Sequence, residues 1–206
     1  MNKPRYIGQA ILDISKTIMY KFHYDFIMKN FSEAVLLFTD TDSFCYFIPT
    51  EEDIYAYIRG NTRWFDFSNY PQNHPNFDMS NYLIPGMFKD EFGGFFIQEF
   101  CGLRSKMYSI LKYGGEEKKA ANGVLEQVKN DEITHRDFKD CLIKLRARYH
   151  GGMKILQKDH ELYTVNAVKK TLNPYNDKKY ISFDGSEFLC YSYGHYKIKS
   201  HGNIAK

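Results

Sequence analysis

The strongest pattern along the chain is a pair of apolar runs, residues 35–38 and 44–48, around a short polar tip. Apolar runs of this length predict buried strands, and a connection of about five residues predicts a hairpin. The tip contains two carboxylates one residue apart, Asp40 and Asp42. We therefore expect an antiparallel hairpin that presents an acidic tip on a rigid mount.

Two helices are predicted by apolar residues that recur every three or four positions. The first covers residues 5–30 and should pack under the hairpin, and its stripe consists of Ile7, Ile11, Ile14, Ile18, Phe22 and Phe26. The second begins after Thr134, a predicted N-cap with Asp137 near a capping-box position, and should end at Gly151-Gly152. Its stripe consists of Phe138, Cys141, Leu142, Leu145 and Tyr149.

The other segments predict a short helix at 53–59, an aromatic-rich connection that packs in the core, and strands. Gly93-Gly94 and Gly114-Gly115 predict turns, the latter within a basic hairpin or loop at 112–130, and Asn173-Pro174 and Asp184-Gly185 predict two more. The predicted strands are 95–97, 100–111, 162–168, 179–183 and 187–193. Together these elements indicate the α+β class, with antiparallel sheets.

Composition restricts the class of protein. The chain has 206 residues, large enough for a real core, and 17% of them are aromatic, which argues against disorder. No stretch approaches the roughly 18 apolar residues of a membrane-spanning helix, and the N-terminus lacks a charged-then-apolar leader. Four scattered cysteines (Cys45, Cys101, Cys141 and Cys190) predict reduced thiols rather than disulfides or zinc ligands. We therefore expect a soluble, intracellular protein of a reducing compartment with no membrane partner.

Charge is distributed unevenly along the chain. Residues 1–100 carry 8 Lys+Arg against 13 Asp+Glu, whereas residues 101–206 carry 20 against 12. This asymmetry predicts an acidic, metal-using front and a basic rear that could meet a polyanion, although a merely solvated basic surface would have the same composition.

Asp40 and Asp42 are a candidate metal site. On an extended backbone their side chains point to one face, where two like charges repel, and a divalent cation removes that conflict. Carboxylate oxygens suit magnesium or manganese. A plain hairpin turn explains the same residues, since Asp, Thr and Ser are ordinary turn formers.

An EF-hand calcium loop is excluded, because Phe44 and Cys45 occupy positions of a ligand and the turn glycine. Nucleotide-sugar transferases and phosphatases also use Asp-x-Asp.

A second candidate site lies on the predicted strand 100–111. Arg104, Lys106 and Tyr108 share one parity, and Leu103 and Met107 share the other. On a single strand the three polar residues would span about 13 Å, long enough to touch successive phosphates of a nucleic acid. An ordinary exposed sheet face is the alternative interpretation.

Three motifs together resemble the C-terminal part of the protein-primed family-B DNA polymerases, found in linear plasmids, some viruses and Polinton-type elements. Phe38-Thr39-Asp40-Thr41-Asp42-Ser43 resembles the palm motif with its Asp-Thr-Asp-Ser core. Lys106-Met107-Tyr108 resembles the Lys-x-Tyr motif, which holds the primer terminus. Ala121-Asn122-Gly123-Val124, followed by Lys129 and the helix start at Thr134, is similar to the beginning of the thumb.

The resemblance implies a DNA-directed DNA polymerase, with a palm portion at residues 1–111 and a small mixed thumb at 112–206. It implies that Asp42 is a direct ligand of two divalent metal ions, magnesium in the usual two-metal scheme, with Asp40 as the supporting catalytic and metal-site carboxylate. It implies that Lys106 and Tyr108 position the primer strand, and strand parity adds Arg104. The implied partners are a DNA primer–template and deoxynucleoside triphosphates, with a terminal priming protein as a further candidate.

The same family needs another metal-binding aspartate and a nucleotide-binding lysine/tyrosine helix before the hairpin, and only 39 residues precede Asp40. A proofreading exonuclease region is also missing. We therefore expect a C-terminal fragment or truncated copy that is a poor catalyst, or none, by itself. Two alternatives stay open: a non-catalytic DNA-binding remnant, and a metal-dependent Asp-x-Asp glycosyltransferase, which the strand-rich rear half disfavours.

Overall fold

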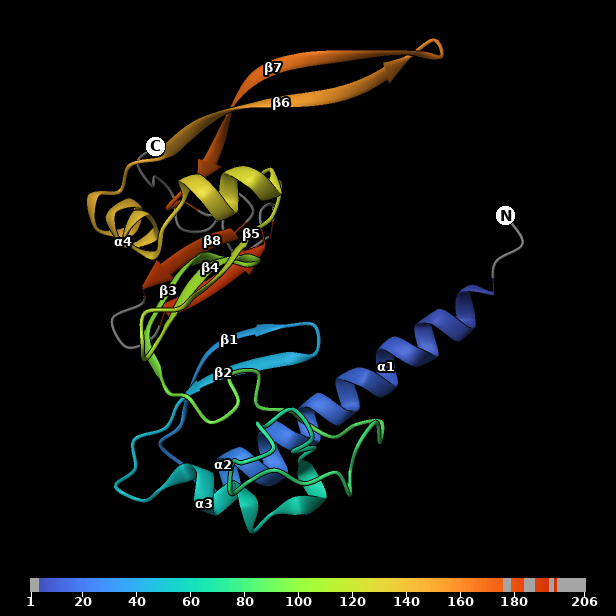
Figure 1. The fold of residues 1–206 in the computed structure, drawn as a ribbon, viewed down its shortest axis with the longest axis vertical. Coiled ribbons are helices and arrows are strands. Elements are labelled where there is room, and N and C mark those ends of the chain that lie inside the picture. Colours follow the sequence, from blue (N-terminus) through green and yellow to red (C-terminus); the bar gives the residue numbers. More distant parts are fainter. Residues whose placement is uncertain (1–3, 176–178, 184–187, 193–194, 196–206) are drawn as a thin grey trace. The chain divides into compact units, whose positions relative to one another are not determined.

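The computed structural model describes residues 4–175, 179–183, 188–192 and 195, and these form an α+β protein with small antiparallel sheets (Figure 1). The α+β prediction is thus confirmed. The chain divides into a first unit, Met1–Phe96, and a second unit, Ile97–Lys206. The boundary predicted at 111/112 falls inside a sheet of the second unit, so the Lys-x-Tyr segment belongs with the basic region.

The first unit begins with the predicted long helix. Helix α1 (Arg5–Lys21) continues through a π-helical turn, η1 (Phe22–Ile27), into α2 (Met28–Asn30). The stripe is buried only toward its C-terminal end, at Phe22 and Phe26, whereas Ile7, Ile11 and Ile14 are 48%, 59% and 61% exposed. The expectation that the whole stripe packs under the hairpin is therefore wrong for its first half.

An aromatic core joins that helix to the hairpin and to the connection that follows. Strands β1 (Val35–Asp40) and β2 (Ser43–Phe47) form the predicted antiparallel hairpin, followed by α3 (Ile54–Arg59) and the 3-10 turn η2 (Thr62–Trp64). The buried side chains of this core are Phe22, Phe26, Ile27, Ile58, Phe65, Phe67 and Tyr70. Trp64 and Phe77 pack against it, so the aromatic connection is held as predicted.

Strand β1 is more exposed than its apolar sequence predicts. Val35, Leu36 and Leu37 are 52%, 37% and 39% exposed. The sheet has two strands, and its contacts with the helix come from Phe44 and Tyr46 of β2. The prediction of two buried strands is therefore wrong for β1.

The second unit is built on a three-stranded sheet and one helix. The sheet runs β3–β4–β5, with β3 (Ile97–Arg104), β4 (Met107–Lys112) and β5 (Glu117–Ala121). After the π-helical turn η3 (Val128–Glu132), helix α4 (His135–Lys144) packs Phe138 and Cys141 into the core. Thr134 and Asp137 form the predicted capping box. Strand β3 starts at Ile97, so the strand predicted at 95–97 is absent from this described segment.

A long hairpin follows α4, formed by β6 (Arg148–Lys158) and β7 (Glu161–Leu172) (Figure 1). The helix ends at Lys144 because Leu145 adopts a left-handed conformation, so the predicted end at Gly151-Gly152 is wrong and Tyr149 lies in a strand. Strands β8 (Lys179–Phe183) and β9 (Phe188–Ser192) agree with prediction. The turn predicted at Asp184-Gly185 lies outside the described residues.

Cys45, Cys101 and Cys141 are buried free thiols, as predicted, and burial raises their pKa values, that of Cys45 to about 11. None of the helices in the described ranges combines the length and apolarity needed to cross a membrane.

Candidate functional site

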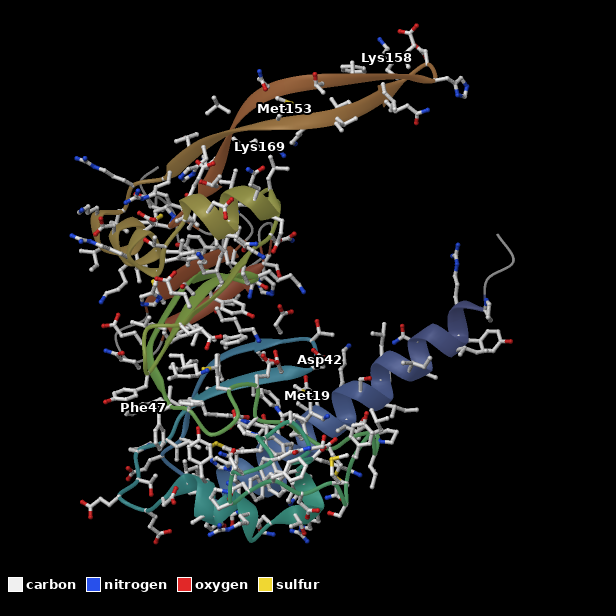
Figure 2. All side chains as sticks on the ribbon, in the orientation of Figure 1. Met19, Asp42, Phe47, Met153, Lys158 and Lys169 are labelled. Carbon is white, nitrogen blue, oxygen red and sulfur yellow. The ribbon has the colours of Figure 1, made fainter. Side chains whose placement is uncertain are left out.

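The acidic tip is a two-residue turn. Asp40 and Ser43 form the last pair of the β1–β2 ladder, and Thr41 and Asp42 connect them. The Asp42 side chain is exposed, at the point where Figure 2 labels it, and Asp40 is half-buried. The backbone N–H of Asp42 donates to the carbonyl of Asp40 at 2.7 Å, which closes the turn tightly.

Thr41, between the two carboxylates, has φ +59°. A β-branched residue rarely adopts this left-handed region, and such a conformation costs about 1–3 kcal/mol. Because the chain is bent here, the parity argument that placed Asp40 and Asp42 on one face of an extended strand does not apply. The tip instead brings both carboxylates into one short, strained turn.

The oxygen atoms of the tip define what it can bind. Thr41 Oγ1 donates to Asp40 Oδ1 at 3.2 Å, and Ser43 Oγ donates to the Asp40 carbonyl at 3.2 Å. This all-oxygen donor set suits a hard cation such as Mg²⁺ or Mn²⁺. Within the described part of the chain, no three His, Cys, Asp or Glu side chains gather as a metal-ligand group. The tip could thus supply two carboxylates, and the remaining ligands of an octahedral ion would come from water or substrate.

Aromatic packing under β2 holds the hairpin in place. The Phe44 ring stacks on Phe22 with a centroid distance of 6.1 Å, and His23 Nδ1 hydrogen-bonds the Tyr46 hydroxyl at 2.9 Å. His23 is therefore a packing residue, as predicted. Burial raises the pKa of Tyr46, so its hydroxyl stays protonated at neutral pH.

Arg104, Lys106 and Tyr108 do not share one strand. Strand β3 ends at Arg104, β4 starts at Met107, and Ser105-Lys106 forms the turn between them, with Lys106 at φ +58°. The predicted straight row of about 13 Å is therefore wrong. Lys106 is exposed in the turn, and Tyr108 packs near Phe100, with 6.2 Å between ring centroids.

The opposite face of this sheet has the predicted apolar character. Leu103 and Met107 are buried in the core of the second unit. The β3–β4 turn therefore presents a cation at its tip while the sheet below it is anchored by that core.

A Ser–His–Glu arrangement in the same unit was not predicted from the sequence. His135 Nδ1 hydrogen-bonds Ser109 Oγ at 2.9 Å and His135 Nε2 contacts Glu99 Oε2 at 3.1 Å, which also accepts from Lys139 Nζ at 2.7 Å. The order of groups is that of a hydrolytic triad. Ser109 is 0% exposed, however, so its hydroxyl cannot reach a substrate. The cluster is a structural network that ties α4 to the sheet.

Comparison with known proteins yields no assignment: no family model matches the chain, and neither a curated protein nor a solved structure matches it.

Proposed function

We propose that the chain is the palm–thumb portion of a DNA-directed DNA polymerase of the protein-primed family-B type. The observation that carries the proposal is the strained tip of the β1–β2 hairpin, where Thr41 at φ +59° separates Asp40 from the exposed Asp42. Two-residue hairpin turns often need a positive φ, but a β-branched residue such as Thr41 rarely adopts it, and strained backbone of this kind clusters at functional sites. The motif order supports the same proposal, since Lys106 and Tyr108 follow on a basic unit.

Each residue has a role under this proposal. Two divalent metal ions, when bound, would activate the primer 3′-hydroxyl and stabilise the transferring phosphate. Asp42 would hold these ions directly, and Asp40, half-buried and hydrogen-bonded by Thr41, would orient the turn. Lys106 and Tyr108 would position the primer strand through its backbone, with Arg104 beside them.

Net charge is consistent with this division of roles. Residues 97–206 carry 20 Lys+Arg against 13 Asp+Glu, which favours a polyanionic partner. The partners would be a primer–template and deoxynucleoside triphosphates, with a terminal protein as the priming partner. Because the tip offers two carboxylates, too few to hold two octahedral ions firmly, we expect this chain alone to incorporate no nucleotides.

Metal binding tests the tip. Mn²⁺ titrated into the protein and followed by electron paramagnetic resonance should bind weakly, and Asp42→Asn should abolish that binding. Glu51→Gln removes one exposed negative charge from the same unit and is the matched control, which should bind Mn²⁺ as before. Equal binding by Asp42→Asn and the parent would favour a plain turn, and thus a DNA-binding remnant with idle aspartates.

Nucleic-acid binding tests the basic turn. A labelled primer–template should bind regardless of sequence, with an affinity that falls steeply as salt rises. Lys106→Ala should reduce the slope of log affinity against log salt by about 0.9, the value for one phosphate contact on duplex DNA. Binding that is insensitive to salt, or no binding at all, would refute the polymerase proposal.

A further inference from the structure

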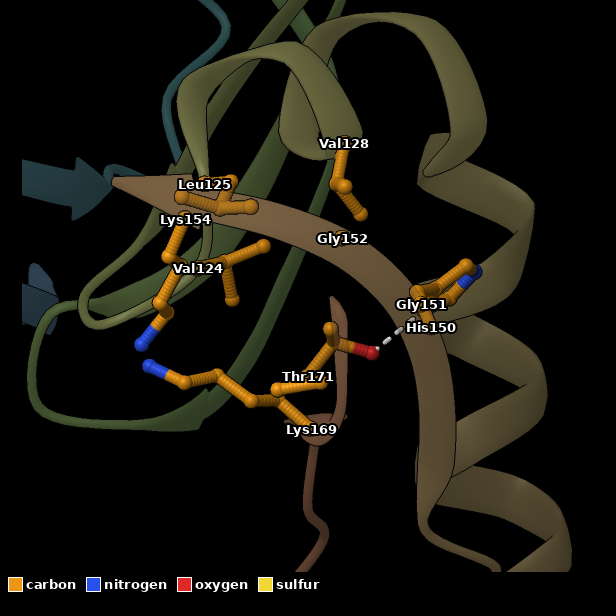
Figure 3. Close-up of a pocket in the computed structure, with 10 residues that line it drawn as sticks. Val124, Leu125, Val128, His150, Gly151, Gly152, Lys154, Lys169 and Thr171 are labelled. Carbon is orange, nitrogen blue, oxygen red and sulfur yellow. Dashed lines mark hydrogen bonds between the residues drawn. The ribbon is translucent and has the colours of Figure 1, made fainter. Parts of the chain in front are cut away.

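A hollow lies at the root of the β6–β7 hairpin, over residues 124–128, which lead into η3 (Figure 3). Its floor is apolar, made by Val124, Leu125 and Val128. Lys154 and Lys169 reach over this floor from the two strands, and Figure 3 shows their ends pointing toward one another. None of the residues proposed above to bind metal or DNA lines this hollow.

The strand register explains why the two lysines meet. Lys154 lies opposite Val165 and Lys169 lies opposite His150. The two lysines therefore lie on the same face of the hairpin but in different rows, where a row is one cross-strand pair. The row between them pairs Gly152 with Ala167, the two smallest side chains of that face. Because this row adds almost no bulk, both long side chains can lean inward across it.

The arrangement concentrates positive charge. A hydrogen bond with the Lys169 side chain lowers the pKa of Lys154, and desolvation and the charge of Lys169 act in the same direction. Among the residues that the structure describes, neither lysine has a carboxylate partner within ion-pair distance. The lining of the hollow contains no acidic side chain either. An anion is the group that would relieve this repulsion.

His150 adds a polar ring to the lining. Thr171 Oγ1 donates its single hydrogen to the Arg148 carbonyl at 3.2 Å. In its contact with His150 Nδ1 at 2.6 Å it must therefore accept, so Nδ1 carries a hydrogen. Nε2 is then the remaining polar atom of the ring. The hollow therefore contains three nitrogen-bearing side chains on an apolar floor.

We propose that Lys154 and Lys169 together bind one phosphate group, and that its source is the backbone of a nucleic acid. Phosphate oxygens can accept from both ammonium groups at once, and lysine binds phosphate as a point charge without reading sequence. The choice of a nucleic acid as the source of this phosphate rests on the proposed function, because free phosphate has the same chemistry. Both lysines are half-exposed on an open hairpin face, where a long strand can pass without being enclosed.

Binding of labelled DNA tests the site. The double variant Lys154→Gln/Lys169→Gln should weaken binding of a labelled duplex, followed by anisotropy, on the order of tenfold at low salt. The salt slope should fall by about 0.9. Lys158→Gln/Lys170→Gln removes two charges from the same hairpin outside the hollow, with Lys158 near its far end (Figure 2), and is the matched control, with a much smaller effect. Equal losses in the double variant and the control would overturn the proposal, since they would indicate nonspecific charge.

A second readout separates this site from the polymerase proposal. The pKa of Lys154, followed by NMR of its ε-methylene, should rise when duplex DNA is added and far less with equimolar inorganic phosphate. If the pKa of Lys154 rises with phosphate but not with DNA, the hollow is an anion site whose ligand is not a nucleic acid. That result would also count against the polymerase proposal. DNA binding that the double variant leaves unchanged would overturn the lysine site while the polymerase proposal stands. No change in Lys154 with either ligand would overturn the site as well.

Discussion

Replacing Asp66 by alanine should destabilise the first unit by about 3 kcal/mol. The Asp66 side chain is 2% exposed and accepts from the backbone N–H groups of Ser68 at 2.9 Å and Leu83 at 3.3 Å. It also forms an ion pair with Lys89 at 3.2 Å. Its backbone holds the segment in place, since the Asp66 N–H donates to the carbonyl of Phe88, whose ring stacks on Phe22. Asp66 thus fixes the layer on which the β1–β2 hairpin rests.

The magnitude follows from these contacts. Each backbone donor left without its acceptor costs about 1 kcal/mol where water can partly replace it. Loss of the ion pair adds about 1 kcal/mol rather than the larger value of a sealed pair, because the Lys89 side chain is 39% exposed. Lys89→Met should therefore cost only about 1 kcal/mol, since Asp66 keeps both backbone donors.

Urea unfolding followed by tryptophan fluorescence measures the effect, because Trp64 is the only tryptophan and lies in the first unit. Asp78→Ala is the matched control: Asp78 accepts from the Ser80 N–H at 2.8 Å in a similar turn, but it is exposed. We expect the control to lose less than about 0.5 kcal/mol. A loss below about 1 kcal/mol in Asp66→Ala, or a loss equal to the control, would refute the reasoning.

The same residue predicts a pH dependence. Burial by itself raises the pKa of Asp66, but hydrogen bonds from Ser68 and the contact with Lys89 outweigh it and leave the pKa below its ordinary value. A lowered carboxyl pKa contributes stability above about pH 4, and that contribution is lost as pH falls through the lowered pKa. The stability difference between the parent and Asp66→Asn, which cannot ionise, should therefore shrink below about pH 4.

Three further predictions follow from the structure. Thr41→Gly should stabilise the first unit by about 1 kcal/mol in the tryptophan assay, because glycine adopts positive φ without strain, and no gain would mean that the turn is unstrained. Glu99→Gln should reduce the loss of second-unit stability below about pH 4, measured by near-ultraviolet circular dichroism. Hydrogen bonds from a lysine and a histidine of α4 lower the pKa of Glu99, so in the parent its contribution is lost as the carboxylate is protonated. Gly152→Ala should cost about 1 kcal/mol by the same measurement, because the end of the Leu125 side chain must move aside for the new methyl group, whereas Gly151→Ala meets no atom within 4 Å and should be nearly neutral.

Local patterns predicted the elements whose determinants are close in sequence. The capping box needs only Thr134 and Asp137, three residues apart, and it formed as predicted. The long helix formed because its periodicity runs without a Gly or Pro interruption beyond Gly8. How much of its stripe is buried depends instead on distant partners: Phe22 and Phe26 find the aromatic core, and Ile11 does not.

Turns formed by residues without turn propensity were the ones missed. Lys106 and Leu145 both adopt positive φ, a conformation usually left to glycine, so neither the β3–β4 turn nor the end of α4 has a sequence signal. Gly151-Gly152 resembles a helix stop, but in the structure it lies in β6, where Gly152 permits the approach of Leu125. Glycine kept for close packing and glycine kept for a turn look the same in a sequence.

The candidate sites differ in how far sequence could identify them. Asp40 and Asp42 were found because their spacing alone implies a shared tip, although the strained turn replaced the extended geometry assumed for them. The pairing of Lys154 with Lys169 was invisible, because it depends on the register of an eleven-pair hairpin whose first strand was not predicted. A site formed across strands needs the register before its members can be recognised as neighbours.

The two sites pose the same electrostatic problem with opposite sign. The hairpin tip places the carboxylates of Asp40 and Asp42 in one short turn, and the hollow brings the ammonium groups of Lys154 and Lys169 together. Under the two proposals, a ligand of opposite charge would relieve like-charge repulsion at each site. A metal-bound nucleic acid carries a cation for the first site and phosphate for the second. Because anything that binds only the folded protein stabilises it, such a ligand should raise the free energy of unfolding, whereas a plain turn and an ordinary basic surface predict no such gain.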